Sequence, residues 1–199
     1  MRHSMIGMAL ACLISPLAPA LSQAPASAPV QALSDGLIAT MKAGKGAGQR
    51  GREAIIGPIV DRSFDLPLMT RLVVGSAWPG LSPQDQAALL AAFRKMTIAQ
   101  YADNFDSWSG ERIIVDPNDQ ARGTDRLVRT SLVASGGKPT AIAYRLRQSA
   151  GGWKIIDVFY RDAISQLATR RADFATVLQR GGAKALIQHI EALNAKTSG

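Results

Sequence analysis

The sequence is nearly free of cysteine. Cys12 is the only one, and it lies in an N-terminal segment that is interpreted below as a leader. A chain without cysteine forms no disulfide, has no thiolate nucleophile and offers no sulfur ligand to a metal. Disulfide-stapled folds, thiol enzymes and cysteine-ligated metal sites are therefore excluded for the rest of the chain.

Histidine is almost as scarce, because His189 is the only one that follows the leader. One histidine without cysteine excludes nearly all zinc geometries and Cys–His dyads. Ser165 has no base nearby in the sequence and lies outside a Gly-x-Ser-x-Gly elbow. Asp116, Asn118 and Asp119 match no calcium-binding loop and predict a turn instead. We expect no metal and no cofactor.

Long apolar runs are missing except at the N-terminus. There the apolar run Met5–Ile14 follows a basic start and precedes the small residues Ala18–Ala20, which predicts a signal peptide over residues 1–20. A second possible cleavage site ends at Ala26. Acylation of Cys12 is an alternative, although the apolar run before it is short for a lipoprotein leader. No later segment approaches the roughly 18 apolar residues of a membrane span, so we expect a soluble protein exported to the periplasm.

Acidic side chains are fewer than basic ones. The chain has 23 Lys and Arg against 15 Asp and Glu, a net charge of +8. Loss of the leader with Arg2 would leave 22 against 15, or +7. This excess either keeps the protein soluble or attracts it to anionic lipid headgroups. Export argues against nucleic acid as a partner.

Turn-forming residues divide the chain into segments. Pro, Ala and Ser dominate the stretch after the leader, so we expect a disordered linker over residues 21–33 and one domain over residues 34–195. A Gly-rich stretch at 44–51 lacks the Lys-Ser/Thr ending of a phosphate-binding loop, and we expect a flexible loop. Apolar periodicity predicts helices at 31–42, 53–65, 67–77, 82–105, 163–180 and 183–195. Ser82 as N-cap and Pro83 at the first helical position predict the start of the fourth of these.

Between residues 110 and 160 the pattern changes to that of strands. β-Branched and alternating residues, separated by Gly-rich turns, predict strands at 112–116, 125–134, 140–148 and 152–160. In the third of these, Tyr144 and its apolar neighbours share one face, while Arg145 and Arg147 share the other. Such alternation is typical of an antiparallel sheet with one buried face. We expect an α+β fold: a single domain with a four-stranded antiparallel meander packed against several helices around an apolar cavity.

Two charged residues are unusual for their positions. Asp157 lies in the middle of an apolar strand, where it is either a hydrogen-bonded structural acid or a general base whose pKa is raised by desolvation. Arg171 is seven residues from both Ile164 and Leu178, which would place all three on one helical face. An arginine on an apolar stripe either extends its head group to solvent or pairs with a buried or bound anion. Asp157 and a lipid headgroup are both candidate partners.

The last third of the chain has a characteristic series of residues in fixed order: Trp153, Asp157, Ser165, Arg171, Phe174, Leu178, Gly181, Gly182 and Leu186. Phe93 and a Tyr101-Ala102 step precede the predicted sheet. In this order and spacing the sequence resembles the MlaC (toluene-tolerance) family of periplasmic lipid-binding proteins. The family usually has Glu-Gly where this chain has Arg161-Asp-Ala163, which leaves a hopanoid-associated branch of the family open.

The resemblance implies a monomeric lipid carrier that serves membrane-bound components of an ABC-type transport system in the inner and outer membranes. Its ligand would be a phospholipid or a hopanoid-type lipid. Exposing two acyl chains of about 16 carbons to water would cost on the order of 25 kcal/mol at about 0.8 kcal/mol per methylene, so transfer needs a carrier. The residues expected to bind the lipid are Leu72, Phe93, Met96, Tyr101, Ile142, Tyr144, Leu146, Ile156, Val158, Ile164, Leu167, Arg171 and Phe174.

Two other hypotheses remain open at this point. The first is an enzyme with Asp157 acting as a base on a hydrophobic lipid or polycyclic terpenoid. The second is an adaptor with a filled core that only binds membrane proteins. The pairing of Asp157 and the size of the cavity discriminate among the three.

Overall fold

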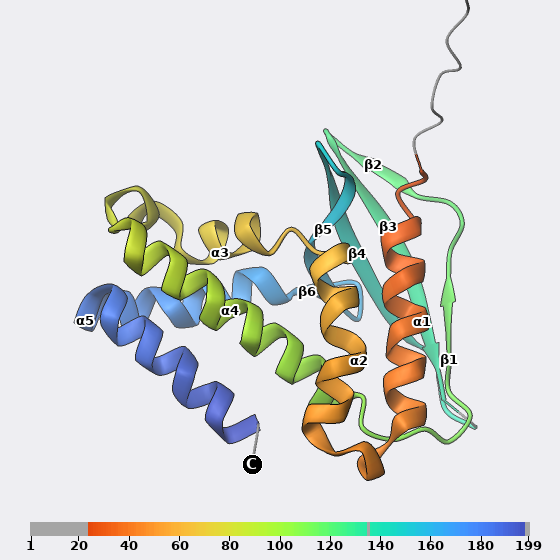
Figure 1. The fold of residues 1–199 in the computed structure, drawn as a ribbon. Helices are drawn as coiled ribbons and strands as arrows, with labels where there is room; N and C mark the ends of the chain where they lie inside the picture. Colours follow the sequence, from red (N-terminus) through yellow and green to blue (C-terminus); the bar gives the residue numbers. More distant parts are fainter. Residues whose placement is uncertain (1–23, 135, 198–199) are drawn as a thin grey trace, which may run out of the picture.

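The computed structural model describes residues 24–134 and 136–197; the predicted signal peptide and Cys12 lie outside the described residues. Within these ranges, five helices and an antiparallel sheet form one α+β domain, which confirms the predicted fold class (Figure 1). The helices are α1 (Ala28–Ala43), α2 (Gly48–Ser63), α3 (Leu66–Val74), α4 (Pro83–Asn104) and α5 (Gln166–Thr197). The strands are β1 (Arg112–Val115), β2 (Gln120–Arg122), β3 (Asp125–Val133), β4 (Thr140–Ser149), β5 (Gly152–Tyr160) and β6 (Ile164–Ser165).

Helices α1 and α2 lie side by side across one face of the sheet (Figure 1). Helix α1 begins inside the predicted linker, so residues 28–33 are helical and not disordered. Val30 and Leu33 are completely buried, and their burial outweighs the loop-like composition of the segment. The flexible loop predicted over residues 44–51 is also mostly helical, because η1 (Lys45–Ala47) and the first turn of α2 occupy most of these positions.

Helices α3 and α4 both begin with a side-chain cap. The Asp65 carboxylate accepts a hydrogen bond from Leu68 N at 2.9 Å, and the Ser82 hydroxyl accepts one from Asp85 N at 3.1 Å. The cap at Ser82, followed by proline at the first helical position, was predicted and is confirmed. These caps set where α3 and α4 start, and α4 then crosses the middle of the helical group (Figure 1).

The sheet has the order β1-β3-β4-β5-β6, with β2 paired to β3 and every pair antiparallel. The four predicted strands are present, and β2 and β6 were missed because segments of three and two residues carry no alternation. The face toward the helices is apolar, with Val128, Leu146 and Ile155 fully buried. The opposite face carries Arg145 and Arg147, so the sheet has one dry side and one charged side.

Helix α5 is interrupted by a kink at Gly182, where φ is +65° and the backbone is not helical, so the two predicted C-terminal helices are present on either side of it. The bend turns the second half of α5 back alongside α4 (Figure 1). Asn194 in that half donates a hydrogen bond to Ala92 O of α4 at 3.3 Å. Among the described residues, none of the helices is both long and apolar enough to cross a bilayer.

Candidate functional site

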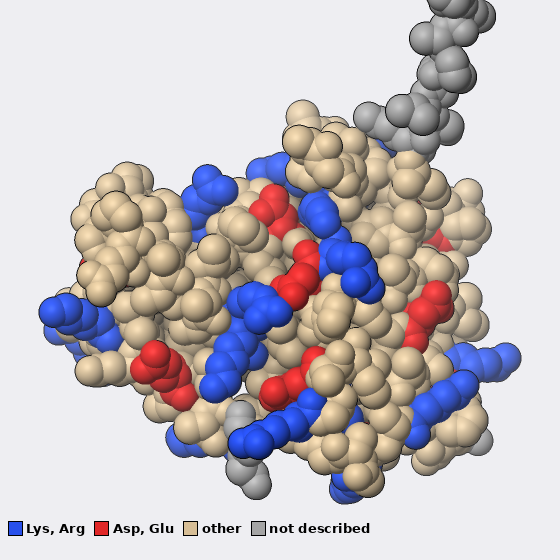
Figure 2. Space-filling view, in the orientation of Figure 1, with Lys and Arg blue, Asp and Glu red and all other residues tan. Residues whose placement is uncertain are grey.

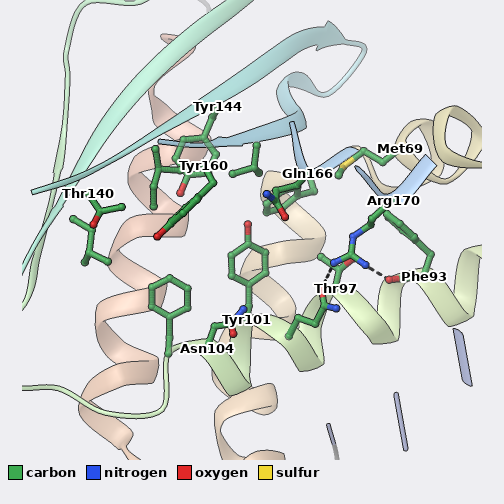
Figure 3. Close-up of a pocket in the computed structure, with 16 residues that line it drawn as sticks. Met69, Phe93, Thr97, Tyr101, Asn104, Thr140, Tyr144, Tyr160, Gln166 and Arg170 are labelled. Atoms are coloured by element: carbon green, nitrogen blue, oxygen red, sulfur yellow. Dashed lines mark hydrogen bonds between the residues drawn. The ribbon is translucent and has the colours of Figure 1, made fainter. Parts of the chain in front are cut away.

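A cavity of about 520 Å³ lies between the sheet and the helices α3, α4 and α5. Its sheet wall comes from β3, β4 and β5, and its helical wall from α4 and the start of α5. The exposed side chains of Asn104, Tyr160 and Gln166 mark where the cavity meets solvent. The lining residues are Phe64, Met69, Phe93, Thr97, Gln100, Tyr101, Asn104, Phe105, Leu132, Thr140, Ile142, Tyr144, Val158, Tyr160, Gln166 and Arg170 (Figure 3).

Aromatic rings form the middle of the cavity. The Tyr101 ring lies between Phe64, with ring centroids 5.7 Å apart, and Phe105, at 6.2 Å. The Tyr101 hydroxyl points across the cavity toward the sheet, where Tyr144 is located (Figure 3). Rings packed in this way present broad apolar surfaces with few polar atoms, which suits a long hydrocarbon ligand.

Both tyrosine hydroxyls keep their protons. Burial raises the pKa of Tyr144 to about 12, although a hydrogen bond with Thr130 opposes the shift. Burial also raises the pKa of Tyr101 well above its ordinary value, with Tyr144 adding to the effect and Arg170 opposing it. Neither hydroxyl is therefore a base at neutral pH, and each remains a neutral hydrogen-bond donor.

One end of the cavity carries a cation. Arg170 Nη1 donates to Met96 Sδ at 3.3 Å, and Nη2 donates to Gln100 Oε1. In the described part of the chain, no carboxylate lies within 4.0 Å of this guanidinium. Burial lowers the pKa of Arg170, with Tyr101 and Asp173 opposing the shift, but an arginine remains charged at neutral pH.

Asp157 lies outside the cavity lining and has a structural role. Its carboxylate accepts hydrogen bonds from Val158 N at 2.7 Å, Ser165 Oγ at 2.6 Å and Leu167 N at 3.0 Å. Ser165 Oγ in turn accepts from Ala168 N at 2.9 Å and so caps the start of α5. The carboxylate thus links β5 to β6 and to the first turn of α5. Of the two alternatives given above, Asp157 is the hydrogen-bonded structural acid.

Five of the thirteen residues expected to bind lipid line the cavity: Phe93, Tyr101, Ile142, Tyr144 and Val158. Four others are buried in the surrounding core: Met96, Leu146, Ile156 and Phe174. Leu72 and Leu167 are partly buried away from the lining, and Ile164 is 52% exposed. Arg171 is exposed and lies against Gly75, not in the cavity. Contact with a ligand remains a prediction for the whole set.

The cationic residue of the cavity is Arg170, one position before the arginine chosen from the sequence. Arg171 was aligned with Ile164 by helical spacing, but Ile164 belongs to β6 and precedes the helix. Phe174, four residues after Arg170, is buried, and that spacing identifies the inward face of α5. Two further polar residues of the cavity, Thr97 and Gln100, follow Phe93 on the inner face of α4 and were also missed.

The chain is similar to a solved structure described as the phospholipid-binding protein from Ralstonia solanacearum in complex with a phospholipid. The two share 25% sequence identity and superpose with a TM-score of 0.77, over 88% of this chain and all of the other. A comparison with curated proteins gives no match.

The sequence model of the MlaC protein family matches residues 31–192, which is most of the chain. The match spans most of α1, the helices α2 to α4, the whole sheet and most of α5, so it includes every wall of the cavity. The likeness of sequence and of fold agree, and the protein belongs to the MlaC family.

Proposed function

We propose that the protein is a periplasmic lipid-binding carrier that moves phospholipid or hopanoid-type lipid between membranes. The observation that supports this most directly is the aromatic cavity of about 520 Å³ under the sheet. A membrane lipid crosses an aqueous gap very slowly by itself, because each exposed methylene costs about 0.8 kcal/mol. A cavity that shields those methylenes removes this cost, and no reacting group is needed.

The Ralstonia solanacearum relative was solved with a phospholipid, which makes an acyl lipid the natural first candidate for this chain. The predicted leader would place the protein in the periplasm, between two membranes. We propose that it acts there as a monomer and exchanges lipid with membrane-bound components of an ABC-type transport system.

The hydrogen bonds of Asp157 favour a carrier over an enzyme. A general base must direct a free lone pair at the substrate, whereas two backbone amides and one hydroxyl already occupy three of the roughly four acceptor sites of this carboxylate. It also lies outside the cavity lining. The cavity itself favours a carrier over an adaptor, because a protein that only docked to other proteins would need no such space.

Native mass spectrometry of protein purified from periplasm tests the proposal. We expect a stoichiometric lipid on the wild-type protein, and transfer of that lipid between donor and acceptor vesicles. Ile142→Trp should fill the cavity and abolish both, because Ile142 lines it. Ile114→Trp is the matched control, since Ile114 is also a strand residue but is 54% exposed. Wild-type protein that carries no lipid and transfers none would contradict the carrier function.

A further inference from the structure

The face of the sheet away from the helices has a shallow hollow of about 350 Å³, which shares no lining residue with the cavity under the sheet. Its floor is apolar and crosses three strands. Ala143 of β4 pairs with Arg129 of β3 and with Phe159 of β5, and paired residues of neighbouring strands share a face. Leu127, two residues before Arg129, lies on the same face and also lines the hollow. The floor therefore offers a small apolar patch.

The rim of the hollow is basic. Arg122, Arg129 and Arg145 line it together with one acid, Asp162. The side chains of Arg129 and Arg145 are 36% and 43% exposed, and Arg122 is exposed as well. In the part of the chain that the structure describes, no carboxylate lies within 4.0 Å of Arg122. The rim thus presents guanidinium donors to solvent around an apolar floor.

Two aspartates contact the rim arginines in different ways. Asp125 is 1% exposed and accepts from Arg145 Nε at 2.5 Å, so it holds that guanidinium in place. The Asp162 carboxylate lies 3.6 Å from Arg129 Nε, and its side chain is 38% exposed. An exposed ion pair of this length contributes little. Asp125 therefore positions one arginine, whereas an incoming carboxylate can replace Asp162 beside the other.

The turn that carries Asp162 has an unusual backbone. Arg161 and Asp162 have φ of +53° and +56°, in the left-handed region that favours glycine. The turn is held by a hydrogen bond from Arg161 N to Ala141 O at 2.8 Å. Disfavoured backbone of this kind persists where the surrounding structure enforces it, and it is frequent at binding sites. The turn keeps Asp162 at the rim.

The chemistry of the hollow favours an acidic protein segment over a membrane surface. A bilayer is flat on this scale and attracts Lys and Arg alike, whereas a concave site with an apolar floor accepts a protruding side chain. The basic residues that line the hollow are all arginines. Arginine binds carboxylates in a paired geometry and is enriched at protein interfaces, where lysine is depleted. A complementary segment has an aromatic or aliphatic side chain between Asp or Glu residues.

We propose that the hollow is a docking site for an acidic segment of a protein partner. An apolar side chain of the segment would contact Leu127 and Phe159, and its carboxylates would bind Arg122 and displace Asp162 from Arg129. Resting on the carrier function proposed above, the partner would be one of the membrane-bound components. Docking on this face would leave the cavity on the other side of the sheet free to load or unload.

Selection from a random peptide library, with the mature protein as the target, tests the docking site. Peptides of about ten residues suffice, because an extended chain covers about 3.3 Å per residue and neighbouring strands are about 4.8 Å apart. We expect the selected peptides to be enriched in Asp and Glu around an aromatic or aliphatic residue. Replacing the acids of the tightest peptide by Asn and Gln should weaken it roughly 10-fold or more. A selection without this acidic enrichment, or without any peptide, would overturn the inference.

Two single substitutions should shift the affinity for that peptide in opposite directions. Arg122→Glu should weaken it roughly 3- to 10-fold, and Asp162→Asn should strengthen it roughly 2- to 5-fold by removing the acid that competes for Arg129. Asparagine tolerates the left-handed backbone, and a gain of affinity cannot result from misfolding. The matched controls Arg180→Glu and Asp173→Asn make the same changes of charge at exposed positions of α5 and should leave the affinity unchanged. Equal effects at the rim and on α5 would overturn the inference, because they would show general attraction to net charge.

The remaining outcomes separate this inference from the carrier function. If Arg122→Glu abolished binding to phosphatidylglycerol vesicles and left the peptide affinity unchanged, the hollow would be a membrane site and the inference would be wrong. Wild-type protein that carries lipid but selects no acidic peptide would refute the docking site alone. Wild-type protein that selects acidic peptides but carries no lipid would refute the carrier function and, with it, the assignment of the partner to a membrane-bound component.

Discussion

At the scale of single residues, Asp157 shows how a charged group in an apolar strand is stabilised. The residue is only 6% exposed, and the three donors to its carboxylate come from the junction of β5, β6 and α5. Removing the carboxylate would leave Val158 N and Leu167 N without a partner. Donors left without a partner at this half-buried junction are costly, so the carboxylate stabilises the fold there.

Asp157→Ala should therefore lower the free energy of unfolding by about 2–3 kcal/mol, as measured by urea denaturation. The control is Asp173→Ala, because Asp173 is exposed on the same helix; it should change stability by less than about 0.5 kcal/mol. Wild-type stability of Asp157→Ala would show that the carboxylate does not hold the junction together.

Asp125 is the second buried acid, 1% exposed, on the charged face of the sheet. Its carboxylate accepts from Arg145 Nε at 2.5 Å and from Arg147 Nε at 2.7 Å. The hydrogen bond from Arg147 is the largest effect that lowers the pKa of Asp125, followed by the hydrogen bond from Arg145, while burial opposes both. The ionised acid therefore stabilises the fold.

Asp125→Asn should reduce stability at pH 7 by about 1–2 kcal/mol, a value discounted because both arginine side chains are 40% or more exposed. The folded pKa lies below the ordinary value of about 3.9, so this contribution is complete above pH 3.9 and is lost as the pH falls through the folded pKa. Urea denaturation of both proteins from pH 7 down to pH 2 measures it. Asp103→Asn, at an exposed acid, is the control. A gap between wild type and variant that widened toward low pH would contradict this assignment.

At the scale of elements, the bend of α5 depends on one glycine. Gly182 has φ of +65°, a conformation that costs other residues roughly 1–2 kcal/mol. Gly57 lies inside α2, and a methyl group there would meet Ile98 at an ordinary contact distance of 3.6 Å. The same substitution thus has opposite consequences in two helices.

Gly182→Ala should lower the free energy of unfolding by about 1–2 kcal/mol. Gly57→Ala should raise it by about 0.5–1 kcal/mol, because alanine is the better helix former. Thermal and urea denaturation of the two variants beside the wild type measure both changes. Equal effects in the two helices would show that the bend does not require glycine.

The elements also show what the sequence can and cannot predict. Apolar periodicity and caps located α4 and the four longer strands, because these features are local. The start of α1 was missed because Val30 and Leu33 gain their stability from contacts with distant parts of the fold. Arg170 was missed because Ile164, which was used to choose the inward face of the helix, belongs to β6, and α5 begins only at Gln166. The local sequence pattern therefore predicts helices and strands, whereas the lining of the cavity depends on which face each of them turns toward the others.

At the scale of the whole molecule, both faces of the domain carry charged side chains. Figure 2 shows Lys and Arg interspersed with Asp and Glu over the face that carries the helices. The opposite face of the sheet has a shallow hollow of about 350 Å³ lined by Arg122, Arg129 and Arg145 together with Asp162. The excess of basic residues in the described chain, 22 Lys and Arg against 15 Asp and Glu, does not come from one run of basic residues.

Such a surface should bind anionic vesicles weakly and reversibly. In co-sedimentation, we expect binding to phosphatidylglycerol vesicles at low salt and little binding to neutral phosphatidylcholine vesicles. Binding should disappear near 1 M salt, where the Debye length falls to about 3 Å. Binding that persisted at high salt would indicate apolar insertion instead of electrostatic attraction.

The contact between Arg170 and Gln100 has a consequence for the resting protein. In a carrier of the kind proposed above, this contact would hold the guanidinium in place while the cavity is empty, because Gln100 supplies a neutral oxygen from the cavity lining itself. An amide oxygen is a weaker acceptor than a carboxylate or a phosphate, so an anionic group that entered the cavity would displace it. Binding and release of such a group would then exchange one hydrogen-bond acceptor for another.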